Sequence, residues 1–151
     1  MIKDVKIKSI KRFADDRGYL AEIIKEGEET FCEVKQTSYT VAYPNVIKAF
    51  HWHKKQSDVW FPVSGNLQVV LYDMREDSPT YQETQVIYAG EDNPQLIMIP
   101  PQVAHGYRVL GEKPAGLFYH TSEVYDPKNL DEERIEYNDP KIGFDWQTKF
   151  K

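Results

Sequence analysis

The segment Glu33–Val41 reads EVKQTSYTV, and its pattern decides the expected fold. Polar and apolar residues alternate along it, and its second half is rich in residues that favour β-strands. Side chains two residues apart lie on the same face of a strand, so the alternation predicts a strand with one buried face.

Eight further segments have the same strand character, and turn residues such as Tyr43–Asn45, Ser64–Asn66 and Gly111–Pro114 separate them. About eight to ten short strands at this spacing favour an all-β sandwich or barrel over alternating strands and helices. The other predicted strands are Val5–Ile10, Val46–His53, Val59–Val63, Leu67–Tyr72, Thr84–Tyr88, Gln95–Ile99, Gly106–Leu110 and Ala115–Thr121.

Helical character is confined to two short segments. Lys25–Thr30 and Leu130–Arg134 are each predicted to form one or two helical turns, too short for several turns of amphipathic periodicity. The polar segment Tyr125–Lys151 is expected to wrap around the β-structure as a tail. We therefore expect one domain that spans residues 1–151.

Composition excludes several classes of function. The 151 residues include 19 Lys and Arg against 24 Asp and Glu, a formal net charge of −5, which argues against binding to a nucleic-acid backbone. The single cysteine, Cys32, cannot form an internal disulfide. The first residues lack the pattern of a secretory signal, and no apolar segment approaches the length of a membrane span. These features predict a cytoplasmic protein that binds neither nucleic acid nor membrane.

Three histidines are candidates for the functional site. His51 and His53 are two residues apart on one predicted strand and therefore project to the same face, and His105 lies at the start of a later strand. Together with Asp58, they have the spacing of ligands in metal-binding cupins, and three imidazoles with one carboxylate suit Fe, Mn, Ni or Zn.

The same histidines also fit proton transfer. A histidine has a suitable pKa for a general base near neutral pH, and a tyrosine on the opposite wall, for which Tyr125 is a candidate, can return the proton. A third interpretation is that the histidines are strand residues with a structural role.

The chain resembles the dTDP-4-dehydrorhamnose 3,5-epimerase family, which consists of cupin-like sugar-nucleotide enzymes. The resemblance extends in the right order along nearly the whole chain. The matching segments are Asp16–Glu22, Val46–Trp52, Gln56 with Gly65, Asp73–Thr80, Ile99–Gly106, Tyr125–Pro127 and Asn138–Trp146.

The resemblance implies a cupin-like jelly roll and a role for several residues. His51 matches the catalytic base, and Tyr125 matches the tyrosine of a Tyr-x-Pro motif that is proposed as the general acid. Lys48 stands where the family has an arginine beside the substrate. His105 matches the histidine of an Ala-His-Gly motif at the sugar site.

Nucleotide binding and assembly are also implied by the resemblance. Arg17, Glu22 and Gln36 match positions that help to hold the nucleotide, partly across a dimer interface, so a homodimer is expected. The family is metal-independent, so the resemblance implies neither metal nor cofactor, and we expect chelation to leave activity intact.

The departures from the family fall close to His51. His53 and Lys54 give the sequence His-Trp-His-Lys, which is similar to a His-Ala-His-Lys motif of sugar 3,4-ketoisomerases, and Asp58 replaces a lysine. In many members, an extension past the last tryptophan carries an aspartate that is hydrogen-bonded to the base. This chain ends five residues after Trp146, so an equivalent of that aspartate is not expected.

We expect another carboxylate to support His51, with Asp58 as the first candidate and Asp73 and Asp145 as second candidates. The alternative for Asp58 is a salt bridge to Lys48 or Lys54. Three arginines are candidates for the substrate diphosphate: Arg17, Arg75 and Arg108.

The predicted function is epimerisation of a nucleotide-linked 4-keto-6-deoxy sugar by proton abstraction at C3, C5 or both, in the synthesis of surface polysaccharide. Four residues are candidate donors to O4 of that sugar: Lys48, His53, Lys54 and His105. Three alternatives remain: a sugar-nucleotide 3,4-ketoisomerase, a metal-dependent cupin enzyme, and a sugar-nucleotide-binding cupin without catalysis.

Overall fold

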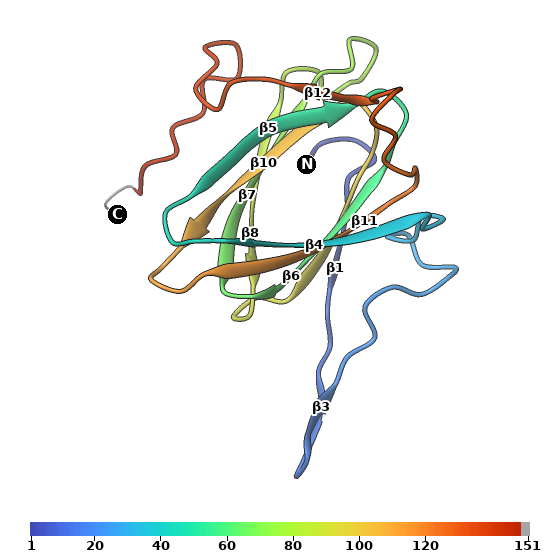
Figure 1. The fold of residues 1–151 in the computed structure, drawn as a ribbon, viewed down its shortest axis with the longest axis vertical. Helices are drawn as coiled ribbons and strands as arrows, with labels where there is room; N and C mark the ends of the chain where they lie inside the picture. Colours follow the sequence, from blue (N-terminus) through green and yellow to red (C-terminus); the bar gives the residue numbers. More distant parts are fainter. Residues whose placement is uncertain (149–151) are drawn as a thin grey trace.

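The structure, a computed structural model, describes residues 1–148 and is built from two antiparallel β-sheets that face each other (Figure 1). One five-stranded sheet has the order β1-β9-β6-β11-β4, and the other has the order β12-β5-β10-β7-β8. A separate hairpin consists of β2 and β3. The strands are β1 (Lys6–Ser9), β2 (Phe13–Asp15), β3 (Gly18–Leu20), β4 (Gln36–Ala42), β5 (Ile47–His53), β6 (Asp58–Ser64), β7 (Asn66–Asp73), β8 (Thr84–Gly90), β9 (Gln95–Ile99), β10 (Val103–Leu110), β11 (Ala115–Thr121) and β12 (Glu132–Arg134).

This architecture confirms the all-β prediction. All nine strands expected from the alternation are present, with boundaries that differ by up to three residues. Between the two sheets, the inward side chains of both form one hydrophobic core that includes Trp60, Val69, Leu71 and Leu117. Burial of these side chains stabilises the closed sandwich.

The two predicted helices are wrong. Residues 25–30 form successive turns, and residues 132–134, inside the segment Leu130–Arg134, form β12. β12 pairs with β5 through Glu132 and His53, Glu133 and Trp52, and Arg134 and His51. Pairing with an open sheet edge satisfies more backbone groups than one isolated helical turn would. Within residues 1–148, no helix of a length and hydropathy that could span a membrane occurs.

The C-terminal tail packs on the outer face of the sheet that contains β5, as far as residue 148. Trp146 is buried against Phe50, with ring centroids 5.4 Å apart, and its indole N–H donates to the carbonyl of Tyr137. Ile135 exchanges two backbone hydrogen bonds with Phe50. The expectation of a wrapped tail is confirmed up to residue 148, and residues 149–151 lie outside the described part of the chain. The tail packs against β5, the strand that carries His51 and His53.

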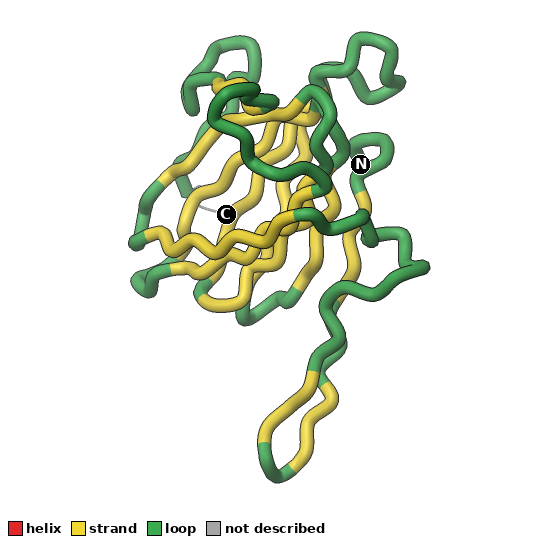
Figure 2. Tube along the Cα trace, turned by 45° about the vertical axis from the view of Figure 1, so that its right-hand side comes forward, coloured by secondary structure: helices red, strands yellow, loops and turns green. Residues whose placement is uncertain are grey.

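The hairpin of β2 and β3 projects away from the sandwich (Figures 1 and 2). All six of its strand residues are exposed, and Tyr19 and Leu20 are 61% and 64% exposed. These large apolar side chains make the hairpin a candidate contact surface.

Candidate active site

Two histidines from neighbouring strands meet inside the sandwich. His105 on β10 lies opposite His51 on β5 in the strand register, and their Nε2 atoms are 2.9 Å apart. The Nδ1–H of His105 donates to the carbonyl oxygen of Val103 at 2.8 Å, which fixes the ring with Nε2 toward His51. His53, two residues after His51, projects to the same side, and its ring centroid lies 5.4 Å from that of His51.

A register shift beside this pair brings Lys48 to the same cavity. Between His105 and Tyr107 on β10 there are two residue steps, whereas their partners on β5, His51 and Lys48, are three steps apart. In a regular strand Lys48 and His51 would face opposite sides, but the irregularity lets both line one cavity. β10 has a glycine here, Gly106, because any Cβ would lie 2.3 Å from the Cβ of Ala49.

Asp58 reaches the histidines from the facing sheet. The Oδ2 of Asp58 lies 3.5 Å from Nε2 of His105, and its Oδ1 lies 3.8 Å from Nε2 of His53. Gln56 donates to Oδ1 at 2.7 Å, and the indole N–H of Trp60 donates to Oδ2 at 3.1 Å. Asp58 is 2% exposed. The expected contact with a histidine is present, but it is with His105 and His53 rather than directly with His51.

The salt bridges to Lys48 or Lys54 that were the alternative for Asp58 are not present. Lys48 donates to the hydroxyl of Thr40 and Lys54 pairs with Glu133, so neither lysine forms a salt bridge with Asp58. Asp73 is engaged by Arg75, and Asp145 lines a different cavity. Asp58 is therefore the carboxylate of this cluster.

Burial controls the ionisation of the cluster. Burial is the largest cause of the lowered pKa of His51, and the charge of His105 is the second. Together they hold this pKa well below its ordinary value. Burial lowers the pKa of His53 as well. For Asp58, burial acts to raise the pKa, but His105, His53 and Gln56 outweigh it and hold the pKa below its usual range. At neutral pH, His51 and His53 are therefore neutral and Asp58 is ionised.

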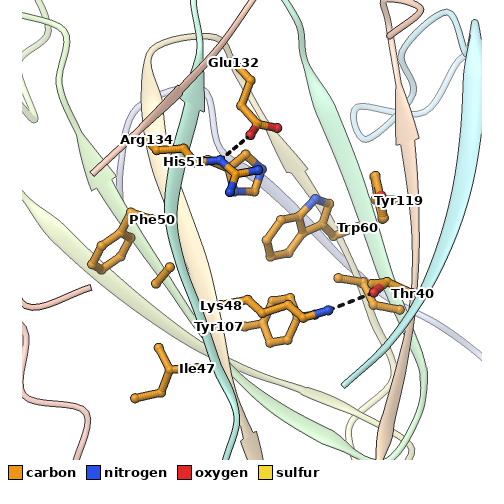
Figure 3. A pocket seen from close by; sticks show the side chains of 12 residues that line it. Thr40, Ile47, Lys48, Phe50, His51, Trp60, Tyr107, Tyr119, Glu132 and Arg134 are labelled. Carbon is orange, nitrogen blue, oxygen red and sulfur yellow. Dashed lines mark hydrogen bonds and ion pairs between the residues drawn. The ribbon is translucent and has the colours of Figure 1, made fainter. Parts of the chain in front are cut away.

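A cavity of about 510 Å³ opens beside His51 between the two sheets (Figure 3). Lys48 and Tyr107 line it from the histidine-bearing sheet, and Trp60 and Tyr119 line it from the facing sheet. Figure 3 shows Trp60 between His51 and Tyr119. The Tyr107 hydroxyl is buried, and burial raises its pKa to about 12, although a hydrogen bond with the side chain of Thr40 acts to lower it. Tyr107 therefore keeps its proton and can donate it to a ligand.

A second cavity of about 360 Å³ adjoins the first at His51. It is lined by His53 and Asp58 and by two residues predicted from the sequence, Gln36 and Tyr125. The side-chain oxygen of Gln36 accepts the backbone N–H of Tyr125 at 2.9 Å. The Tyr125 side chain itself is 62% exposed at the rim.

Three predicted binding residues lie away from these cavities within one chain. Arg17 pairs with Asp15 in the turn of the projecting hairpin, and Glu22 follows that hairpin and is exposed. Lys54 forms an exposed ion pair with Glu133. These residues do not line either cavity beside His51.

Two candidate arginines for the diphosphate have structural partners instead. Arg75 pairs with Asp73 and Asp4, and Arg108 donates to the carbonyl of Trp146. The cavity beside His51 contains a different arginine, Arg134, whose Nε donates to Glu132 at 2.8 Å (Figure 3). Arg134 was missed because its segment was expected to be helical.

Tyr119 and Trp60 were also missed, although the alternation contained a signal for both. Tyr119 follows the inward Leu117 by two residues, and Trp60 follows Asp58 by two. The strand register places Tyr119 opposite Trp60. The alternation predicts which face these residues occupy, but the pairing of β11 with β6 is needed to place them in one cavity.

Comparison with known proteins gives the family. The family model for dTDP-4-dehydrorhamnose 3,5-epimerase matches residues 1–151. The chain belongs to this family of sugar-nucleotide epimerases. A spore coat polysaccharide biosynthesis protein, SpsL of Bacillus subtilis, is 52% identical over all of both chains. A probable low-salt glycan biosynthesis epimerase, Agl13 of Haloferax volcanii, is 36% identical over 98% of this chain and 96% of its own.

Solved structures agree with this family. The crystal structure of a dTDP sugar isomerase from Desulfovibrio desulfuricans superposes with a TM-score of 0.88 at 25% identity and covers 96% of this chain and 92% of its own. The epimerase RmlC from Legionella pneumophila, in complex with dTDP-4-keto-L-rhamnose, superposes with a TM-score of 0.84 at 25% identity. The superposition covers 96% of this chain and 79% of RmlC. These likenesses confirm the expected cupin-like fold.

Proposed function

We propose that this member of the epimerase family inverts C3, C5 or both of a nucleotide-linked 4-keto-6-deoxy sugar, with His51 as the base. The observation that carries the proposal is the 2.9 Å contact of His51 with His105, backed by Asp58, at the wall of a cavity between two sheets. The names of the relatives support a role in the synthesis of a surface polysaccharide.

The chemistry requires a base beside an acidic C–H bond. A ketone at C4 makes the hydrogens on C3 and C5 acidic, because removal of either gives an enolate that is delocalised onto O4. A neutral His51 can take the proton. Since its Nε2 contacts His105, the nitrogen that remains for the substrate proton is Nδ1.

His105 and Asp58 then support the proton on His51. A His51 protonated at both nitrogens donates from Nε2 to Nε2 of His105, and the carboxylate of Asp58 stabilises positive charge that is shared across the two rings. In this scheme Asp58 is a positioning residue, because it acts on His51 through His105.

Donors for the enolate oxygen line the same cavity. Lys48 and Tyr107 both line this cavity, and each side chain has a polar hydrogen that it could donate to O4. A positioned donor at a developing oxyanion is among the largest contributions to catalysis. The cation that fits a diphosphate at the mouth is Arg134.

Inversion also needs an acid on the opposite face of the sugar. Tyr119 projects from the sheet that faces His51 and lines both cavities, whereas the resemblance implies Tyr125, which is 62% exposed. The geometry favours Tyr119, and Tyr125 fits a role in closing the sugar site. A 3,4-ketoisomerase would instead return the proton on the same face as the base, and the motif His51–Lys54 supports this second candidate.

We further propose a cytoplasmic homodimer. The hairpin that carries Arg17 exposes apolar side chains for a partner, and a second copy would let Arg17 and Glu22 reach a neighbouring nucleotide site. The free thiol of Cys32 fits a reducing compartment.

The decisive experiment is incubation with dTDP-4-keto-6-deoxyglucose in D₂O, followed by NMR. Epimerisation predicts deuterium at C3 or C5 together with an inverted product. A ketoisomerase predicts a keto group moved from C4 to C3, and a binding protein without catalysis predicts no deuterium uptake.

A further inference from the structure

The buried cluster of His51, His53, Asp58 and His105 is more than a base and its support. Three imidazoles and one carboxylate converge from β5, β6 and β10, and one ligand atom from each lies within 4.8 Å of the others. A base needs one partner for its second nitrogen, so His53 is unexplained by proton transfer.

Two of the separations within the cluster are close to those of ligands around one metal ion, and a third is a few tenths of an ångström longer. At metal–ligand distances of about 2.1 Å, two ligand atoms stand about 3.0 Å apart at a right angle and about 3.4 Å apart at the tetrahedral angle. The two Nε2 atoms of His51 and His105 are 2.9 Å apart. Nε2 of His105 lies 3.5 Å from Oδ2 of Asp58, and Nε2 of His53 lies 3.8 Å from Oδ1.

The surroundings orient two of the four ligand groups, those of His105 and Asp58. The Nδ1–H of His105 donates to the Val103 carbonyl, which leaves the lone pair of Nε2 directed into the cluster. Gln56 and Trp60 donate to the two oxygens of Asp58 and fix its carboxylate. Gln56 also lies 3.2 Å from Nε2 of His53, and its amide has to turn away when a metal ion takes that nitrogen.

We propose that His51, His53 and His105 through Nε2, together with Asp58, bind one divalent transition-metal ion of the Zn²⁺, Co²⁺ or Fe²⁺ class. The 360 Å³ cavity lined by His53 and Asp58 gives the ion access and leaves an open coordination position. This binding site is independent of the proposed epimerase function.

Metal binding has a consequence for catalysis that does rest on the proposed function. An imidazole bound to metal through Nε2 carries its proton on Nδ1, the atom to which the substrate proton would be transferred. The loaded protein is therefore inactive in proton exchange, and the metal-free protein is the active form. The ion would act as an inhibitor that competes with the substrate proton for His51.

Co²⁺ is the probe for binding, because its visible absorption reports the coordination number. The untagged full chain, first treated with a chelator and dialysed, is titrated with Co²⁺ and then with Zn²⁺ in an absorbance and calorimetric experiment. We expect one equivalent of each. His53→Gln and Asp58→Asn should each weaken binding by at least the ~10–100-fold that changes around a metal site cause.

His120→Gln is the matched control, because His120 lies outside the cluster and contacts Thr37. It should bind Co²⁺ like the wild type. Thermal melting of each metal-free variant shows whether the variant is folded. If Asp58→Asn does not fold, the test rests on His53→Gln. Wild-type protein that takes up no more Co²⁺ than His53→Gln overturns the metal site.

Deuterium exchange with and without one equivalent of Zn²⁺ tests the consequence separately. We expect Zn²⁺ to reduce wild-type exchange at least tenfold and a chelator to restore it. Stoichiometric binding with undiminished exchange would keep the site but overturn the inhibition and the role of His51 as base. Binding to protein that shows no exchange under any condition would keep the site and contradict the proposed function.

Discussion

The Nε2 atoms of His51 and His105 lie 2.9 Å apart across neighbouring strands, and one proton must lie between them for this contact to be favourable. Because His105 already donates its Nδ1–H to Val103, the protonation of the two rings is linked. The two rings therefore share one proton, with Asp58 beside them, and each of these residues can be tested for a different property of the cluster.

Replacement of His51 tests the base. His51→Asn should lower deuterium exchange at C3 and C5 by at least about 100-fold, since a positioned base contributes on the order of 10²–10⁴-fold. The affinity for dTDP, measured by calorimetry, should stay within about threefold of the wild-type value, because deletion of the base at the sugar site leaves the contacts with the nucleotide intact. His120→Gln is the control and should exchange at the wild-type rate. Exchange by His51→Asn at that rate would exclude His51 as the base.

The roles of Tyr119 and Tyr125 can be distinguished by measuring deuterium uptake and inversion of the sugar in the same reaction. Tyr119→Phe removes the proposed acid but leaves His51, so deuterium should still enter on the base face while the inverted product falls by about 10²-fold or more. Tyr125→Phe should weaken substrate binding and leave the ratio of inversion to uptake unchanged. The opposite assignment is correct if Tyr125→Phe is the variant that takes up deuterium without inversion.

Asp58→Asn tests support of the base through His105. Loss of the charge should lower exchange by about 10²-fold without a change in dTDP affinity, because the positive charge shared by the two histidines is no longer compensated. The variant should also shift the acid limb of the pH profile, which a loss of packing alone would not do. Near wild-type turnover and an unchanged profile would show that Asp58 has no part in proton transfer.

Assembly is tested by sedimentation at micromolar concentration. We expect twice the chain mass for the wild type and the mass of one chain for Leu20→Glu, because Leu20 is 64% exposed on the hairpin and a charge there opposes apolar contact. The matched control is Val124→Glu, since Val124 is 61% exposed but lies outside the hairpin. A monomeric wild type would contradict the dimer and with it the role of Arg17 in a shared site.

Much of the fold could be predicted because the period of two is a local property of the sequence. The nine alternating strands were all found, and the shared face of His51 and His53 follows from their spacing. β12 could not be predicted, since Glu132–Arg134 has no strand pattern and becomes a strand by pairing with the edge of β5. Long-range pairing also decides that Asp58 meets His105 rather than His51.

The three-residue step between Lys48 and His51 shows the same limit within one strand. Alternation predicts opposite faces for them, and the register shift against β10 places both in one cavity. Such a shift depends on two strands together, so one strand's sequence does not reveal it. The exposure of Arg17 has a different explanation under the proposed homodimer, in which a second chain would complete its site and one copy alone would not show it.

The lowered pKa values of His51 and His53 predict that stability falls in mild acid. Their ordinary value is 6.5, and the folded-state pKa of each lies lower, so below about pH 6.5 the unfolded chain binds protons that the folded chain does not. The contribution to stability is therefore present above pH 6.5 and is lost as the pH falls toward the folded values. A histidine contributes a slope of at most about 1.4 kcal/mol per pH unit, and it reaches this slope only while the pH lies well below 6.5 and well above its folded-state pKa.

Urea unfolding of the metal-free protein at pH 7.0, 6.0 and 5.0 measures this slope. His53→Gln should make the loss of unfolding free energy between pH 6.0 and 5.0 smaller than in the wild type, because one of the titrating groups is removed from both states. Lys54→Gln is the control, since Lys54 is exposed and does not titrate in this range. A wild-type free energy of unfolding that does not change between pH 7.0 and 5.0 would contradict a neutral, buried pair of histidines, and with it the ionisation on which the base assignment depends.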